Sequence, residues 1–224
     1  KTSKIFLQLN GKPILSHLID MALDLNFPKI FLLSSYHERE LSDFLKEKYP
    51  TTKQIIPIHG GKSGRKWGVP WLLYSIRQRL GALFVYSDGN ILYDKSILKE
   101  LRNAEILESA IANVVLSLKD LAPTHSRFIL HKDRIQSISA RLPIDKKEGP
   151  HFKGQRYYSL GLMVLRKSIF SFIPNFAREK DLDFIIRDIF RSKKNLIGAT
   201  IYTGYWSAIH SIRDVDKLEI KKLV

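Results

Sequence analysis

Residues 82–90 read ALFVYSDGN, an apolar run that ends in a serine, an aspartate and a glycine. A short run of large apolar residues is typical of a strand buried in an α/β sheet. In open sheets of this kind, ligands bind beyond the carboxyl ends of the strands, which is where Asp88 falls. Asp88 is therefore a candidate ligand for a divalent cation, although an aspartate in a turn also commonly hydrogen bonds the backbone.

Helical and strand-like segments alternate on the N-terminal side of this run. Apolar residues recur at helical spacing over residues 11–25, 38–49 and 70–80, and short apolar runs lie at residues 29–33 and 54–58. This alternation predicts right-handed crossovers and a Rossmann-like, mostly parallel sheet with helices on both faces.

The second half of the chain is richer in strand patterns, and no repeat or low-complexity segment interrupts it. We therefore expect a single domain over residues 1–224. A charged stretch with two prolines and two glycines predicts a long loop at residues 143–156. The other predicted elements are strands at 112–118, 157–165 and 197–203, an antiparallel hairpin at 127–130 and 135–140, and helices near 183–190 and 214.

The composition narrows the classes of function. The 224 residues include no cysteine, which excludes disulfides and suits a reducing cytoplasm. No apolar run approaches the roughly 20 residues of a membrane-spanning helix, so we expect a cytoplasmic protein without a membrane span. The 37 Lys+Arg against 22 Asp+Glu give a formal net charge of +15, spread along the chain. A solvated basic surface is the plainest interpretation, small phosphorylated ligands come next, and nucleic acid comes last.

Few other residues suggest a chemical role. The loop GGKSGRK at residues 60–66 could meet a phosphate, but its spacing is not that of a Walker A loop. Trp67 and Trp206 lie in or beside predicted loops, where an indole ring could stack on a ligand. The seven histidines show no metal-ligand spacing, and no serine lies in a nucleophile-elbow setting.

Three N-terminal segments match a family pattern in order. KIFLQLNGKPIL at residues 4–15 is similar to the motif P-K-P-L-L-P-x-x-G-K-P-L-L. FLLSSYHERELSDF at residues 31–44 is similar to a strand, a Gly-Tyr turn and the helix that follows. The strand that ends in Asp88 takes the place of one that ends in Gly-Asp.

Two C-terminal segments complete the pattern. YSLGLMVL at residues 158–165 resembles the strand N-x-G-I-Y-x-h, and GYW at residues 204–206, followed by Ile209 and Asp214, resembles G-x-W-x-D-I-G-T-P-E-D. Taken in order, the five segments resemble the sugar-phosphate nucleotidyltransferases, particularly the mannose- and heptose-1-phosphate guanylyltransferase-like branch. Their order and spacing make the resemblance more specific than any one segment does.

The resemblance implies a fold and a reaction. The fold would be that of nucleotide-diphospho-sugar transferases, with a small antiparallel hairpin insertion. The phosphate of a sugar 1-phosphate would attack the α-phosphorus of a nucleoside triphosphate, with GTP our expected donor. Such nucleotide sugars feed lipopolysaccharide or other cell-surface polysaccharide synthesis, and relatives commonly form homo-oligomers. By position, Lys4 would contact phosphates, Asp88 would ligate Mg²⁺, Gly161 would let the backbone approach the sugar, and Trp206 would contact substrate.

The sequence also departs from the family pattern. The family's loop G-G-x-G-T-R-L and its first strand precede the P-K-P segment, and this sequence begins just after that point. Ala208 stands where the family has its second metal-binding aspartate. Asp214 keeps a family position, and an aspartate there more often caps a helix. These departures keep open a second hypothesis, a catalytically degenerate regulatory or binding subunit. A third, a basic nucleic-acid-binding domain, would need its basic residues gathered on one face.

Overall fold

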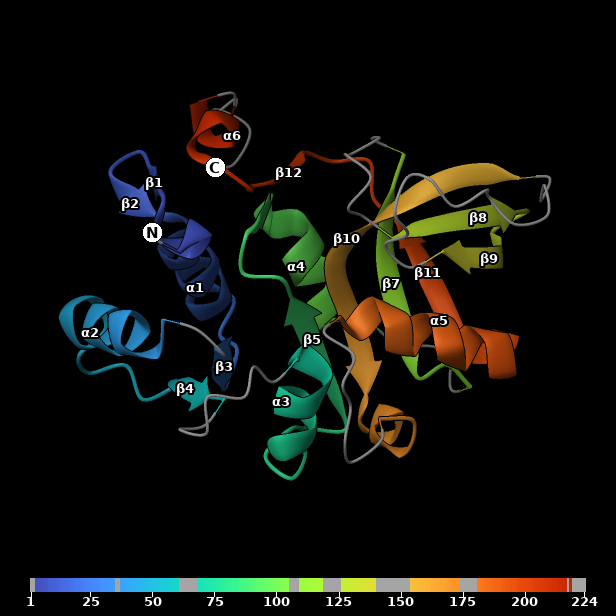
Figure 1. Ribbon diagram of the computed structural model, residues 1–224, viewed down its shortest axis with the longest axis horizontal. Helices are drawn as coiled ribbons and strands as arrows, with labels where there is room; N and C mark the ends of the chain where they lie inside the picture. Colours follow the sequence, from blue (N-terminus) through green and yellow to red (C-terminus); the bar gives the residue numbers. More distant parts are fainter. Residues whose placement is uncertain are drawn as a thin grey trace.

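The computed structural model describes residues 3–34, 37–60, 68–104, 109–118, 126–139, 154–173, 181–216 and 218. Figure 1 shows an N-terminal part, in blue, beside a larger sheet that most of the remaining chain builds. The main elements of the N-terminal part are α1 (Ile14–Asp24), β3 (Ile30–Ser34), α2 (Glu38–Lys48) and β4 (Ile55–His59). These four elements match the predicted helices and strands closely.

The larger sheet has six strands, five of them in the order β11-β7-β10-β8-β9. The sixth, β5, pairs with residues 162–166 of β10, whereas β8 pairs with residues 155–158. The α/β class and the predicted hairpin are confirmed, but the sheet is mixed rather than mostly parallel. Among the described residues, only β7–β11 in this sheet and β3–β4 in a separate small sheet pair in parallel. Strand β10 runs antiparallel to each of its three neighbours, β5, β7 and β8. The strands are β5 (Leu83–Ser87), β7 (Ala112–Ser117), β8 (Arg127–His131), β9 (Arg134–Ser139), β10 (Gln155–Arg166) and β11 (Ile197–Ile201).

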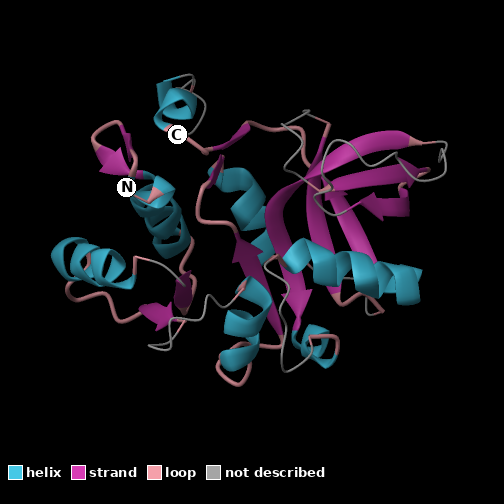
Figure 2. Ribbon diagram, viewed as in Figure 1, coloured by secondary structure: helices cyan, strands magenta, loops and turns pink. Residues whose placement is uncertain are grey.

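Helices cover both faces of this sheet, as the sequence predicts. Alternate residues of β10 enter different clusters: Met163 and Leu165 pack with α5 (Leu182–Ser192) and α3 (Val69–Ser75). Leu160, Leu162 and Val164 pack with α4 (Lys95–Arg102) on the opposite face. Figure 2 shows α5 crossing the sheet. The period of two along a buried strand thus builds a core on each side.

Short elements that the sequence analysis missed join the sheet to the N-terminal part. Strand β6 (Ile91–Tyr93) follows β5 directly and pairs with β12 (Trp206–Ala208). Strands of three residues leave no recognisable period. The other short elements that were not predicted are the 3₁₀ turns η1 (Lys4–Phe6), η2 (Lys167–Ser171) and η3 (Lys194–Leu196) and the two-residue strands β1 (Gln8–Leu9) and β2 (Lys12–Pro13). Helix α6 (Ile212–Asp216) was predicted, and it begins two residues before the expected start near Asp214.

Two predicted boundaries were wrong. Helix α3 ends at Ser75 rather than near residue 80. Strand β10 begins at Gln155, inside the predicted loop at 143–156, because its first residues pair with β8. The rest of that loop up to residue 153, and residues 61–67 with Trp67, lie outside the described part of the chain. Within the described part, no helix is both long and apolar enough to cross a membrane.

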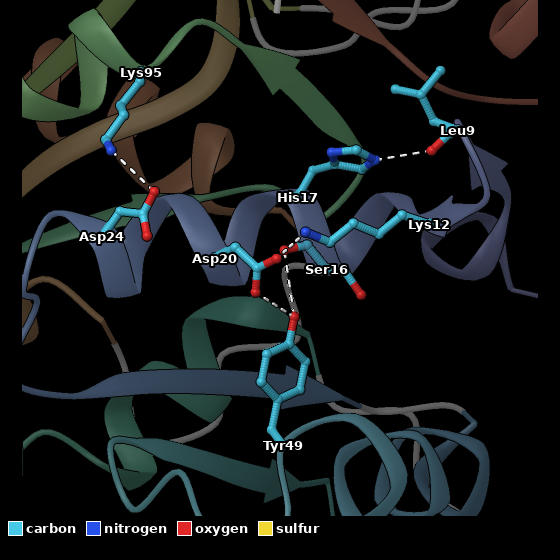
Figure 3. Close-up of polar contacts among 8 residues, drawn as sticks. All are labelled: Leu9, Lys12, Ser16, His17, Asp20, Asp24, Tyr49 and Lys95. Carbon is cyan, nitrogen blue, oxygen red and sulfur yellow. Dashed lines mark hydrogen bonds and ion pairs between the residues drawn. The ribbon is translucent and has the colours of Figure 1, made fainter. Parts of the chain in front are cut away.

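Polar contacts fix helix α1 against its neighbours (Figure 3). Asp20 forms an ion pair with Lys12 and accepts a hydrogen bond of 2.7 Å from the hydroxyl of Tyr49, which follows α2. At the other end of α1, Asp24 lies 3.0 Å from the amine of Lys95 at the start of α4. Burial raises the pKa of Tyr49, as does the hydrogen bond to Asp20, so the phenol stays protonated and donates. These contacts hold α1, and with it the preceding turn η1, in a defined place.

Candidate active site

The candidate site forms where β5 ends against the middle of β10. The backbone N–H of Asp88 donates to the carbonyl of Gly161 at 2.8 Å. Gly161 has φ +70°, and a Cβ built on it would lie 2.8 Å from Cγ of Asp88. Real Cβ atoms do not approach a neighbour so closely, so any other residue here would displace the Asp88 carboxylate, besides adopting an unfavourable positive φ. The structure therefore brings together two residues that the sequence analysis singled out separately.

A tyrosine orients the Asp88 carboxylate. The hydroxyl of Tyr86 donates to Oδ1 of Asp88. Burial raises the pKa of Tyr86 well above its ordinary value, and the charge of Asp88 and the hydrogen bond to it raise it further, with Asp183 and Asp181 adding to the effect. The phenol therefore remains a donor at neutral pH. The sequence analysis missed Tyr86, whose place in an apolar run made it look like a core residue.

Lys4 lies exposed on the turn η1. Ile5, the next residue, lies beside the Asp88 turn, since its Cγ2 would be 3.4 Å from a Cβ at Gly89. Phe6 is buried and packs edge-on against Phe44 of α2, with ring centroids 5.3 Å apart. The packing of Ile5 and Phe6 thus holds η1, the turn on which Lys4 is exposed, against the segment that carries Asp88.

The strand β12 brings Ala208 to the same turn. Ala208 pairs with Ile91, and Ile209 exchanges two hydrogen bonds with Asn90, at 2.8 and 2.9 Å. A residue at position 208 therefore lies close to the segment that follows Asp88, but here it has no carboxylate. Within the described residues, no group of three or more His, Cys, Asp or Glu side chains could hold a metal ion.

Trp206 is the first residue of β12 and belongs to the core. Its side chain is 1% exposed and packs in the cluster with α4. It borders a cavity of about 330 Å³ that Leu118, Tyr202 and Tyr205 also line. Trp206 is thus a core residue that borders this cavity, and its contact with a substrate stays a prediction.

Asp94 and Asp214, two further candidates for a second carboxylate, accept hydrogen bonds at the starts of helices. Asp94 accepts from the backbone N–H of Ser96 at 3.0 Å, at the start of α4, and from the hydroxyl of Tyr202. Asp214 accepts from the backbone N–H groups of His210 and Ser211, at 2.8 and 2.7 Å, at the start of α6. The predicted capping role of Asp214 is confirmed, and the hydrogen bonds of both carboxylates serve the ends of helices.

Comparison with known proteins gives the fold a wider context. No family model matches the sequence. The inositol-1-phosphate CTP transferase of T. maritima superposes with a TM-score of 0.72 at 17% identity, covering 95% of this chain and 82% of that one. A Bacillus anthracis protein assigned as a glucose-1-phosphate thymidylyltransferase, solved with sucrose, gives 0.73 at 17% identity, covering 96% and 85%. HddC from Yersinia pseudotuberculosis complexed with GMP-PN gives 0.68 at 16% identity, covering 99% and 90%.

The chain has the fold of the sugar-phosphate nucleotidyltransferases. In this nucleotidyltransferase fold, the strands β5 and β10 set Asp88 and Gly161 side by side although they lie far apart in the sequence. The sequence pattern predicted both residues as site residues. It did not predict their contact, which depends on the register of the two strands, in which Leu162 pairs with Ser87.

Asp94 gives a pH-dependent prediction for this region. Burial alone would raise the pKa of Asp94, but hydrogen bonds from Ser96 and Tyr202 outweigh burial, so its pKa lies below the ordinary 3.8. Because the pKa of Asp94 is lower in the folded than in the unfolded protein, its ionised carboxylate stabilises the fold. This stabilisation is fully present at pH values above the unfolded-state pKa, near 3.9, and is lost as the pH falls through the lower folded-state pKa. We expect Asp94→Asn to unfold more easily than wild type by no more than about 1 kcal/mol at pH 7, since water screens this partly exposed carboxylate.

Urea unfolding of both proteins between pH 7 and pH 3 tests this expectation. The difference in free energy of unfolding should shrink as the pH drops below 4. A difference that stays constant over the whole range would show that the charge of Asp94 does not stabilise the capped helix.

Proposed function

We propose that the protein is a sugar-1-phosphate nucleotidyltransferase. It joins a nucleoside triphosphate, with GTP as the proposed donor, to a sugar 1-phosphate and releases pyrophosphate. The observation that carries this proposal is the contact between Asp88 and Gly161, within a fold whose solved examples include a CTP transferase and a protein assigned as a thymidylyltransferase. The GTP assignment has support from the guanylyltransferase-like sequence pattern and from the similarity to HddC, which was solved with GMP-PN.

The reaction requires the protein to align the two substrates and to neutralise phosphate charge, and it requires little covalent chemistry from protein side chains. An oxygen of the sugar phosphate forms a bond to the α-phosphorus, and the bond from that phosphorus to pyrophosphate breaks. We assign Lys4 to the triphosphate, because it is exposed beside the Asp88 turn. Gly161 has no side chain, so a substrate can approach its backbone closely. Positioning and electrostatic stabilisation can supply most of the acceleration in such a reaction.

The donors present fit a magnesium ion that arrives with the nucleotide. Mg²⁺ is usually bound by one or two carboxylates together with substrate phosphates, rather than by a complete set of protein ligands. Asp88 would supply the carboxylate, oriented by the hydrogen bond from Tyr86. When bound, the ion neutralises charge that develops on the phosphates. Ala208 leaves this protein without the second carboxylate of the family pattern, so we expect weak metal binding in the absence of nucleotide.

Replacing Lys4 tests its assigned role. We expect Lys4→Ala to weaken triphosphate binding by roughly 1.5–3 kcal/mol, the usual worth of a hydrogen bond to a charged group. Isothermal titration measures the change in Kd, and Lys46→Ala, which removes an exposed lysine on α2, is the matched control. Equal affinities of Lys4→Ala and Lys46→Ala for the triphosphate would show that Lys4 is a solvated surface residue without a role in binding.

Nucleotide-dependent thermal stabilisation tests the proposed function as a whole. Binding to the native state raises the melting temperature by mass action. We expect GTP with Mg²⁺ to give the largest shift among GTP, CTP, UTP, ATP and dTTP. A shift with another nucleotide would correct the donor. Ala208 favours one alternative, a degenerate regulatory or binding subunit, and no shift with any nucleotide would support it.

We also propose that residues 1–224 form one nucleotidyltransferase domain that acts in the cytoplasm and forms homo-oligomers. The near-complete coverage of this chain in the superpositions supports the single domain.

A further inference from the structure

A chain of buried polar groups runs from helix α5 to the candidate site. Asp183, in the first turn of α5, accepts a hydrogen bond of 2.5 Å from the hydroxyl of Ser126. The carbonyl of Ser126 accepts from the backbone N–H of Ser159 at 2.9 Å. The hydroxyl oxygen of Ser159 accepts from the N–H of Gly161 at 3.2 Å. The carbonyl of Gly161 then accepts from the N–H of Asp88, so the chain of contacts ends at the candidate metal ligand.

All three side chains of this buried polar chain are removed from water. Ser126 is 0% exposed, Ser159 is 2% exposed and Asp183 is 8% exposed. Burying hydroxyls and a carboxylate is unfavourable unless each finds a hydrogen-bonding partner. Apolar side chains at these positions would avoid this cost. We therefore ask which part of the structure the polar groups position.

They hold an irregular point of strand β10. The pairing of β10 with β7 shifts register between Ser159 and Met163, and Gly161 within this bulge has φ +70°. Bulges commonly re-aim backbone groups near functional sites. Here the Ser159 hydroxyl lies within the bulge and engages the Gly161 N–H. The Gly161 carbonyl is thereby presented to Asp88.

We propose that Ser159, anchored through Ser126 on Asp183, is a positioning residue that sets the Gly161 bulge and, through it, the location of Asp88. This inference rests on the proposed function for its catalytic consequence, but not for its structural one.

Amide hydrogen exchange tests the structural part without nucleotide or metal. In Ser159→Ala, the amides of Gly161 and Asp88 should exchange at least about tenfold faster than in wild type, while amides in β11 keep their rates. Asp183→Ala should give the same pattern. Asp183→Asn retains an oxygen that can accept from Ser126 and should stay close to wild type. Ser16→Ala removes another buried serine, 3% exposed on α1, and is the matched control.

The catalytic part is measured as the Mg²⁺ concentration that gives half-maximal pyrophosphate release. We expect Ser159→Ala and Asp183→Ala to raise this concentration about tenfold or more, with Asp183→Asn and Ser16→Ala near wild type. Ser159→Thr, which restores a hydroxyl, should recover the wild-type value. If Ser159→Ala does not fold, Ser126→Ala, which removes the link to Asp183, takes its place in both measurements.

The outcomes separate the two proposals. Unchanged exchange at Gly161 and Asp88 in folded Ser159→Ala or Asp183→Ala would overturn the positioning role, whatever the activity. Faster exchange with an unchanged Mg²⁺ requirement would overturn its catalytic consequence. Loss of activity in Asp183→Asn with normal exchange would make Asp183 a direct participant instead. Faster exchange in a protein whose wild type releases no pyrophosphate would leave the positioning role standing and overturn the proposed function.

Discussion

The Asp88→Asn variant is expected to lose turnover by roughly 10²–10³-fold, the usual effect of removing one group that stabilises transition-state charge. An asparagine keeps the size of the side chain and an oxygen that can accept from Tyr86, but it loses the negative charge. We therefore expect the free energy of unfolding to stay within about 1 kcal/mol of wild type. Steady-state kinetics and urea unfolding measure the two quantities.

Asp43→Asn is the control for this change, because Asp43 is an exposed aspartate on α2. It should leave turnover unchanged. If Asp88→Asn instead unfolds the protein while turnover per folded molecule is preserved, Asp88 is a structural residue and the candidate site has been assigned wrongly.

The Gly161→Ala variant should impair both the fold and the reaction. The positive φ of Gly161 costs an L-residue roughly 1–2 kcal/mol, and the new Cβ would also collide with the Asp88 carboxylate. Since Asp88 must move or the bulge must open, we expect destabilisation of about 2–3 kcal/mol or more and a turnover loss of at least about 10²-fold.

Gly11→Ala separates the two causes. Gly11 has φ +72°, almost the same as Gly161, but nothing lies within 4 Å of a Cβ built on it. It should therefore show the backbone strain alone, with turnover near wild type. Equal effects of the two substitutions on turnover would mean that the contact between Gly161 and Asp88 has no catalytic consequence.

Much of the fold could be predicted because its long elements have clear periods. The apolar residues of α1 and α2 recur at helical spacing, and β3 and β5 are short apolar runs. The direction of β10 could not be predicted in the same way. It depends on pairing with β5, β7 and β8, all of which are antiparallel to β10. A strand that is apolar on both faces is the usual pattern of a parallel sheet, so the sequence pattern favoured the wrong direction.

The candidate site was predicted in part. Asp88 and Gly161 were found from motif positions, but their contact depends on strand register. Tyr86 and Ser159 were missed because a residue in an apolar run gives no local sign that its hydroxyl is used. Ser126 was missed because its partner, Asp183, lies far away in the sequence. Only the tertiary structure shows these hydrogen bonds, which join residues that lie far apart in the sequence.

The most direct test of the central claim is pyrophosphate release by the wild-type protein, given Mg²⁺, each nucleoside triphosphate in turn, and mannose, heptose or glucose 1-phosphate. We predict release that requires both substrates and Mg²⁺, is greatest with GTP, and is lost in Asp88→Asn. Folded protein that releases no pyrophosphate with any of these pairs would contradict the assignment of the Asp88 site to nucleotidyl transfer.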